Sequence, residues 1–230
     1  MSSADLFRPD PRPCVLVVPV KPPAIGKSRL GELPADQRRD LAEAFALDTV
    51  EAALHTEGVV AVLVVTDDFR LAARLRSDRC EVIPDGATDD LNATLVQAAA
   101  EVVRRWPDAV PVALCADLPG LVATELRAVL DQVPEGCAAF LRDRAGTGTT
   151  LYAADADHFD PRFGANSAAA HLAAGVREID VLAPSVRADV DDLADLNAAL
   201  VAGVGRHTAA ATGRVTAPAS EQHKGGPPLG

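Results

Sequence analysis

Basic residues are scarce in this sequence, which has 22 Lys and Arg against 33 Asp and Glu and a formal net charge of −11. A general nucleic-acid binder needs an excess of Lys and Arg to displace counterions from the phosphate backbone, so that class is excluded. No apolar run approaches the roughly 20 residues that a membrane-spanning helix needs. Residues 1–13 also lack the apolar core of a secretion signal. These absences predict a soluble, cytoplasmic protein that engages neither nucleic acid nor a membrane.

Several familiar signatures are missing as well. The 4 cysteines are widely separated and form no C-x-x-C pair, so the sequence predicts buried thiols rather than a zinc or redox site. Neither the G-x-x-x-x-G-K spacing of a P-loop nor the dinucleotide-binding G-x-G-x-x-G occurs. No Ser/His/Asp arrangement is evident, and we interpret the histidines, His171 among them, as surface or packing residues.

What the chain does contain is 48% hydrophobic residues, arranged as short β-branched runs that alternate with longer helical patterns. The predicted strands cover residues 15–18, 59–65, 80–83, 110–115, 138–141, 149–153 and 178–182. The predicted helices cover residues 38–55, 69–76, 91–106, 123–133, 166–174 and 193–201. Unbroken apolar strands that alternate with helices are typical of a parallel sheet covered on both faces. We therefore predict a Rossmann-like α/β sandwich with a mostly parallel central sheet.

The organisation along the chain is predicted to be simple. A flexible segment over residues 1–13 precedes a single domain over residues 14–206. From residue 207 the sequence is rich in Ala, Gly, Thr and Pro with few apolar anchors. Such a composition does not offset the entropy lost on ordering, so residues 207–230 are predicted to be a disordered tail.

Candidate ligand-binding residues follow two of the predicted strands, because open parallel sheets bind ligands beyond the carboxyl ends of their strands. Lys21, Lys27, Ser28 and Arg29 form a basic loop in an otherwise acidic chain, which suits a triphosphate. A merely solvated loop is the alternative. Asp117 directly follows the strand at 110–115, where a carboxylate is a common magnesium ligand. A turn or helix cap is the alternative there.

Two further clusters point to charged ligands. In an extended segment, Asp189 and Asp191 project to the same side, and two such carboxylates repel each other unless a cation lies beside them. A purely structural acidic run is the alternative. The segments 146–150 and 163–167 pair glycines with hydroxyls, and the second opens a predicted helix whose free N–H groups could hold an anion. The alternative for this second segment is helix capping by Asn166 or Ser167.

Taken together, the motifs resemble those of the 2-phospho-L-lactate/phosphoenolpyruvate guanylyltransferases of coenzyme F-420 biosynthesis. In chain order they are PVKPPAIGKSRL (19–30), DDLNATL (89–95), CADLPGL (115–121), GTGTTL (146–151), FGANS (163–167) and DVD (189–191). The resemblance extends from about residue 15 to residue 199. It implies a nucleotidyltransferase fold.

The resemblance also implies roles for individual residues. The GTP phosphates would be held by Lys21, Lys27, Ser28 and Arg29. The implied catalytic residues are Lys21, Lys27, Arg29 and Asp117. Asp85 and Asn92 would lie along the nucleoside. One or two Mg²⁺ ions would be bound by Asp117, Asp189 and Asp191. The three-carbon phospho-acid would be bound by Thr149, Gly164 and Ser167.

The implied reaction is attack by a phosphate oxygen of the acceptor on the α-phosphorus of GTP, with loss of pyrophosphate. The Ala/Arg/Val-rich composition resembles that of high-GC bacterial members, which favours phosphoenolpyruvate as the acceptor over 2-phospho-L-lactate. The competing hypotheses are a sugar-phosphate or molybdopterin nucleotidyltransferase and a non-catalytic nucleotide-binding module. A hand-off of the product to the next enzyme of the pathway is a further hypothesis.

Overall fold

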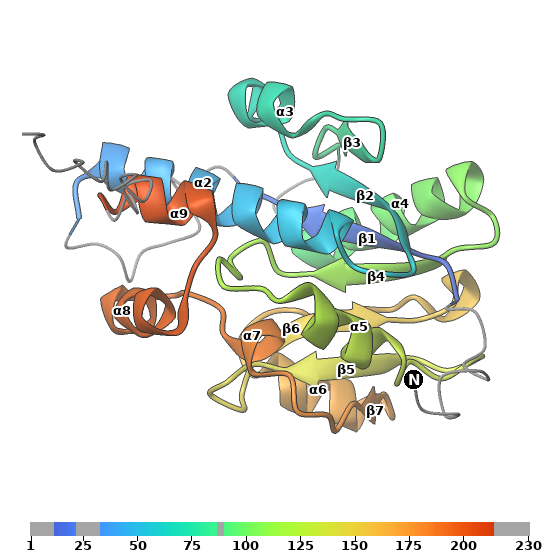
Figure 1. Ribbon diagram of the computed structural model, residues 1–230. Helices are drawn as coiled ribbons and strands as arrows, with labels where there is room; N and C mark the ends of the chain where they lie inside the picture. Colours follow the sequence, from blue (N-terminus) through green and yellow to red (C-terminus); the bar gives the residue numbers. More distant parts are fainter. Residues whose placement is uncertain (1–11, 22–32, 87–89, 214–230) are drawn as a thin grey trace, which may run out of the picture.

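A seven-stranded sheet forms the centre of the protein, in the order β3-β2-β1-β4-β6-β5-β7 (Figure 1). The computed structural model describes residues 12–21, 33–86 and 90–213. The strands are β1 (Cys14–Pro19), β2 (Val59–Val65), β3 (Cys80–Ile83), β4 (Val110–Leu114), β5 (Ala139–Arg142), β6 (Thr149–Ala153) and β7 (Arg177–Glu178). All pairs are parallel except the two made by β6, which runs antiparallel to β4 and β5.

Helices cover both faces of this sheet, as predicted. They are α2 (Ala35–Leu54), α3 (Phe69–Leu75), α4 (Leu91–Arg105), α5 (Ala123–Leu130), η3 (Ala156–His158), α6 (Ser167–Ala173), α7 (Pro184–Arg187), α8 (Leu193–Ala202) and α9 (Arg206–Ala211). In Figure 1, α2, α5 and α7 lie in front of the sheet, and α4 and α6 lie behind it. No described helix is long and apolar enough to cross a membrane.

The alternation of side chains along β1 explains why both faces are apolar. Leu16 and Val18 belong to the cluster that packs against α2, α3, α5 and α7. Val15 and Val17 point the other way, into the cluster that packs against α4 and α6. Because successive side chains of a strand face opposite sides, a continuous run of Val and Leu is stable only between two layers of helices.

The predicted strand at 178–182 was wrong beyond its first residue, because β7 ends at Glu178. The Ile179 N–H still donates to the Phe140 carbonyl at 2.8 Å. Beyond it the Arg187 guanidinium donates to the carbonyls of Ile179 and Val181 at 3.3 and 3.4 Å. These carbonyls are thus satisfied by a side chain instead of a neighbouring strand.

The prediction of disorder from residue 207 was also wrong for residues 207–213. The Asp48 carboxylate of α2 accepts hydrogen bonds from the backbone N–H groups of His207 and Thr208 at 2.9 and 2.8 Å. It therefore caps the first turn of α9, and Thr208 is fully buried. A carboxylate about 160 positions earlier in the chain thus stabilises α9, which the local sequence of residues 206–211 does not predict. Residues 214–230 lie outside the described part of the chain.

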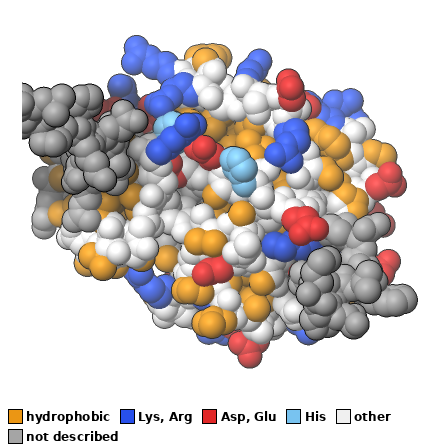
Figure 2. All heavy atoms as spheres, viewed as in Figure 1, with side chains coloured by type: hydrophobic (Ala, Val, Ile, Leu, Met, Phe, Trp, Pro, Cys, Tyr) orange, Lys and Arg blue, Asp and Glu red, His pale blue; other side chains and the backbone are white. Residues whose placement is uncertain are grey.

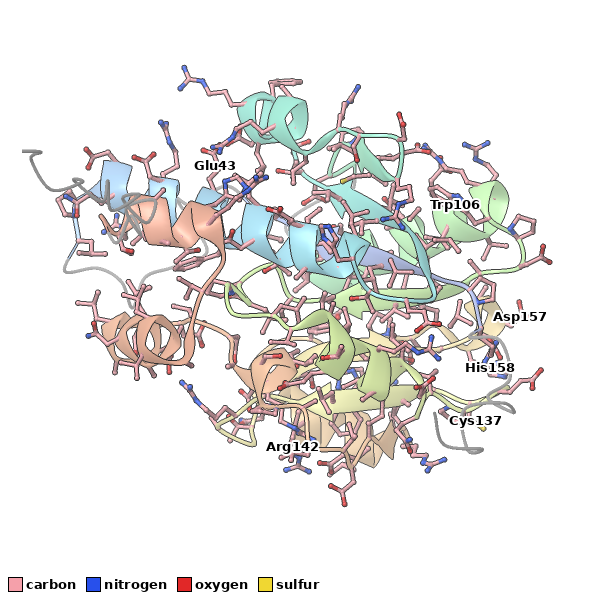
Figure 3. All side chains as sticks on the ribbon, viewed as in Figure 1. Glu43, Trp106, Cys137, Arg142, Asp157 and His158 are labelled. Atoms are coloured by element: carbon pink, nitrogen blue, oxygen red, sulfur yellow. The ribbon has the colours of Figure 1, made fainter. Side chains whose placement is uncertain are left out.

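Charged side chains on the surface are of mixed sign. On the face shown in Figure 2, basic and acidic groups are interspersed with apolar ones. Some are paired between elements, for example Glu43 of α2 with Arg74 of α3, and Arg142 of β5 with Glu178 of β7 (Figure 3).

Candidate active site

The carboxyl ends of β1 and β4 lie side by side and open onto a cavity of about 240 Å³. Lys21 follows β1, and Asp117 follows β4, so the parallel register delivers both to the same edge of the sheet. The opposite walls are apolar and come from Leu91 and Leu95 of α4 and from Phe163. Among the described residues, the cavity therefore combines an apolar wall with the cationic Lys21 and the anionic Asp117.

Asp117 is held in place through its neighbours. The Thr49 hydroxyl of α2 donates to the Ala116 carbonyl and accepts from the Leu118 N–H, both at 3.1 Å. Thr49 and Leu118 are fully buried, so the turn is anchored against α2. The Asp117 carbonyl in turn accepts from the Val190 N–H at 3.0 Å.

This last hydrogen bond brings the segment 189–191 alongside Asp117. Val190 is buried against Leu41 and Phe45. Burial, and then the negative charges of Asp117, Asp191 and Asp143, raise the pKa of Asp189 to about 7. The structure therefore brings the three predicted ligands close enough for their charges to interact, and places a fourth carboxylate beside them.

The grouping of these three carboxylates is looser than that of a second acidic cluster. Among the described residues, the ligand atoms of Asp48, Glu51 and His207 all lie within 4.8 Å of one another, and this group could hold a metal ion. Its Asp48 oxygens, however, already accept the two N–H groups that begin α9. Asp117, Asp189 and Asp191 together offer three carboxylates, the hard oxygen ligands that Mg²⁺ prefers.

Asp143 was not predicted from the sequence, and it shapes the loop before β6. Its carboxylate accepts from the backbone N–H groups of Thr147 and Gly148 at 3.0 and 2.8 Å. A Cβ at Gly148 would overlap the Asp143 carboxylate, so any other residue there would force the Asp143 side chain to move. The Asp-to-glycine spacing in D-x-x-x-x-G is the signal that could have pointed to this loop.

The predicted nucleotide-binding residues are only partly described. Lys21 lines the cavity, whereas Lys27, Ser28 and Arg29 lie outside the described residues. Asp85 accepts from the Thr94 hydroxyl of α4 at 2.7 Å, and this fixes its carboxylate against the first turns of that helix.

Asn92 has a structural partner that sequence reasoning missed. Its amide donates to the Phe163 carbonyl at 3.0 Å and accepts from the Phe163 N–H at 2.8 Å. Asn92 thus holds Phe163, which lines the cavity, against α4. This pair uses one donor and one acceptor of the amide.

The residues predicted to bind the phospho-acid come together. The Thr149 and Ser167 hydroxyls are 3.0 Å apart, and both residues are buried. The Gly164 carbonyl accepts from the Ser167 N–H at 3.2 Å. Gly164 has a φ of 140°, a backbone conformation that residues with a side chain rarely adopt.

His171, which the sequence predicted to be a surface or packing residue, lies next to this pair. It is fully buried, its Nδ1 is 3.1 Å from the Thr149 hydroxyl oxygen, and its Nε2 accepts from the Arg162 N–H at 2.9 Å. Burial lowers its pKa to about 4. The available signal was its position one helical turn after Ser167, which places both on one face of α6.

This mostly parallel sheet, with Lys21 and Asp117 beyond the carboxyl ends of neighbouring strands, has the α/β fold of nucleotidyltransferases. In solved structures the fold is similar to a putative nucleotide-diphospho-sugar transferase from Desulfovibrio desulfuricans, with TM-score 0.61 and 19% identity over 81% of this chain and 85% of the other. It is also similar to Rv0371c of Mycobacterium tuberculosis in complex with manganese, with TM-score 0.51 and 21% identity over 82% and 98%.

Residues 14–216 match the family described as "Guanylyl transferase CofC like", and the chain belongs to this family. A phosphoenolpyruvate guanylyltransferase from Streptomyces scabiei is 48% identical over 210 residues, which are 88% of this chain and 97% of the relative. One from Thermomonospora curvata is 42% identical over 214 residues, which are 91% and 94% of the two chains.

Proposed function

We propose that this protein transfers the GMP moiety of GTP to phosphoenolpyruvate in coenzyme F-420 biosynthesis, forming enolpyruvyl-diphospho-guanosine and pyrophosphate. The family and the names of its relatives support this reaction. Because GTP and phosphoenolpyruvate are intracellular compounds, we place the reaction in the cytoplasm. The product would then pass to the next enzyme of the pathway.

The observation that carries the proposal is that the segment containing Asp189 and Asp191 is hydrogen-bonded through Val190 to Asp117, which lines the cavity together with Lys21. Burial, and after it the charges of Asp117, Asp191 and Asp143, raises the pKa of Asp189, and a divalent cation beside these carboxylates would favour its ionised form. We propose that these three carboxylates hold one or two Mg²⁺ ions. Bound Mg²⁺ would supply neutralisation of phosphate charge.

The remaining side chains would bind and align the two anionic substrates. Leu91, Leu95 and Phe163 would pack against the nucleoside, and Lys21, with the predicted Lys27, Ser28 and Arg29, would bind the triphosphate. Asp85, fixed against α4, would lie along the nucleoside. The phosphoenolpyruvate would bind at the Thr149 and Ser167 hydroxyls and at Gly164.

The reaction needs alignment and charge neutralisation more than acid–base chemistry. A phosphate oxygen of phosphoenolpyruvate forms a bond to the α-phosphorus of GTP. The bond from that phosphorus to the oxygen bridging to the β-phosphorus breaks, and pyrophosphate leaves with the electron pair. A phosphate oxygen is already ionised at neutral pH, so no general base is required.

The test is pyrophosphate release by the purified protein with GTP, Mg²⁺ and each acceptor in parallel: phosphoenolpyruvate, 2-phospho-L-lactate, sugar 1-phosphates and none. Release with phosphoenolpyruvate is expected. Release with sugar 1-phosphates alone would replace the proposal by a sugar-phosphate nucleotidyltransferase. Thermal stabilisation by GTP without release from any acceptor would indicate a binding module.

The carboxylates are tested by Asp117→Asn and Asp191→Asn, which should abolish release while the melting temperature stays near that of the wild type. Asp108→Asn makes the same change at an exposed position before β4 and should leave the rate unchanged. A normal rate in either site variant would remove that residue from the proposed metal site.

A further inference from the structure

His171 is enclosed by aromatic rings in a chain with only 3% aromatic residues. Its imidazole stacks with both Phe140 and Tyr152, with 5.1 Å between ring centroids in each pair, and meets Phe163 edge to face at a centroid distance of 5.9 Å. This surrounding disfavours the charged imidazolium, so the ring is neutral at neutral pH. A neutral imidazole carries its single proton on one of its two nitrogens.

The backbone decides which nitrogen that is. The Arg162 N–H can only donate, and it donates to Nε2 at 2.9 Å, so Nε2 is an acceptor without a proton. The proton therefore resides on Nδ1, which lies 3.1 Å from the Thr149 hydroxyl oxygen. In this hydrogen bond His171 donates and Thr149 accepts.

This direction controls what the two hydroxyls can do. One hydrogen lies between the Thr149 and Ser167 oxygens, which are 3.0 Å apart. With Thr149 accepting from His171, the second hydroxyl hydrogen of the pair is left for an acceptor outside it. In the opposite tautomer, Ser167 would donate to Thr149 and Thr149 to the ring, and the pair would keep no hydrogen to offer.

We propose that His171 is a positioning residue that leaves the Thr149–Ser167 pair one hydroxyl hydrogen to donate to the anionic phospho-acid. The inference rests on the proposed function, because it takes the phospho-acid as the ligand of these hydroxyls. When they are ionised, the carboxylate and the phosphate of such an acid carry hydrogen-bond acceptors and no donors. A site that binds them must therefore present donors. His171 itself touches neither substrate nor metal in this scheme.

Two variants separate this role from packing. His171→Asn keeps an N–H near the position of Nδ1, whereas His171→Gln keeps a polar group near the position of Nε2 and loses the donor to Thr149. We expect His171→Gln to raise the KM for phosphoenolpyruvate about tenfold, the cost of one hydrogen bond to an anion, and His171→Asn to raise it less than threefold. The KM for GTP should stay unchanged in both.

The control is His55→Gln, which removes an exposed histidine at the end of α2 and should leave both KM values unchanged. If His171 acts through packing alone, both variants lose the stacked ring equally, and equal KM values for phosphoenolpyruvate would overturn the proposal. A wild-type protein that releases no pyrophosphate with phosphoenolpyruvate would reject the proposed function instead.

A measurement on the unmodified protein covers the case in which the variants do not fold. Nitrogen-15 NMR of labelled histidine reports the tautomer of each ring, and His171 can be assigned through bonds from its backbone amide. We expect the Nδ1–H tautomer and a change in the Nδ1 resonance when phosphoenolpyruvate is added. An Nε2–H tautomer would overturn the proposal whether or not the enzyme is active.

Discussion

Replacing Asp189 by Asn should stabilise the metal-free protein while it destroys the proposed activity. The folded chain raises the pKa of Asp189 from 3.8 to about 7 through burial and the charges of Asp117, Asp191 and Asp143. Between pH 4 and pH 7 the folded chain therefore holds a proton that the unfolded chain has released. The free energy of unfolding falls as the pH rises through this window, and the destabilisation caused by ionised Asp189 is fully present above pH 7.

The magnitude follows from the two pKa values. Their difference corresponds to at most about 4 kcal/mol, at about 1.4 kcal/mol for each tenfold change in proton affinity. Because Asp189 is partly exposed, solvent screening reduces this to about 1–2 kcal/mol. For a chain of this length, such a gain raises the melting temperature by roughly 2–8 °C.

The assay is thermal unfolding of wild-type protein and Asp189→Asn in chelator at several pH values. We expect the variant to melt higher at pH 8, the gain to shrink toward pH 5 and to disappear near pH 4. Asp180→Asn, at an exposed position after β7, is the matched control and should show no gain at any pH. An Asp189→Asn variant that melts lower than wild type at pH 8 would refute the electrostatic reasoning.

Three other substitutions test the supports of the site. Asn92→Ala removes both hydrogen bonds to Phe163, so it should lower stability by about 1–3 kcal/mol in denaturant titration and raise the KM for both substrates; unchanged KM values would contradict this. Gly148→Ala forces a Cβ into Asp143, so turnover should fall along with the melting temperature, and wild-type behaviour would refute the crowding. Asp48→Ala uncaps α9, so protease should cleave near residue 206 sooner while both KM values stay unchanged.

The relation between sequence and fold is clearest where structure depends on near neighbours. The runs of Val and Leu at 15–18 and 59–65 predicted buried strands, and they form most of β1 and all of β2. The prediction holds because a strand that is apolar on both faces is stable where helices cover both faces of the sheet. The helix at 91–106 was likewise predicted from its periodicity and its proline stop, and α4 ends one residue earlier.

The site divides in the same way. That Asp117 and the segment 189–191 belong to one site was implied by the family resemblance, and the Val190–Asp117 hydrogen bond shows that the two segments are adjacent. By contrast, Asn92 binds backbone groups 71 positions away, which no local pattern signals. The assignments of Lys27, Ser28 and Arg29 stay predictions.

Local sequence thus determined most of the strands and helices, and the polar residues just beyond them, because hydrophobic periodicity acts over a few residues. Only the tertiary structure decided the protonated nitrogen of His171, the raised pKa of Asp189 and the helix at 206–211. Each of these depends on burial and on a partner distant in the chain. Desolvation and hydrogen-bond direction exist only after the chain has brought such groups together.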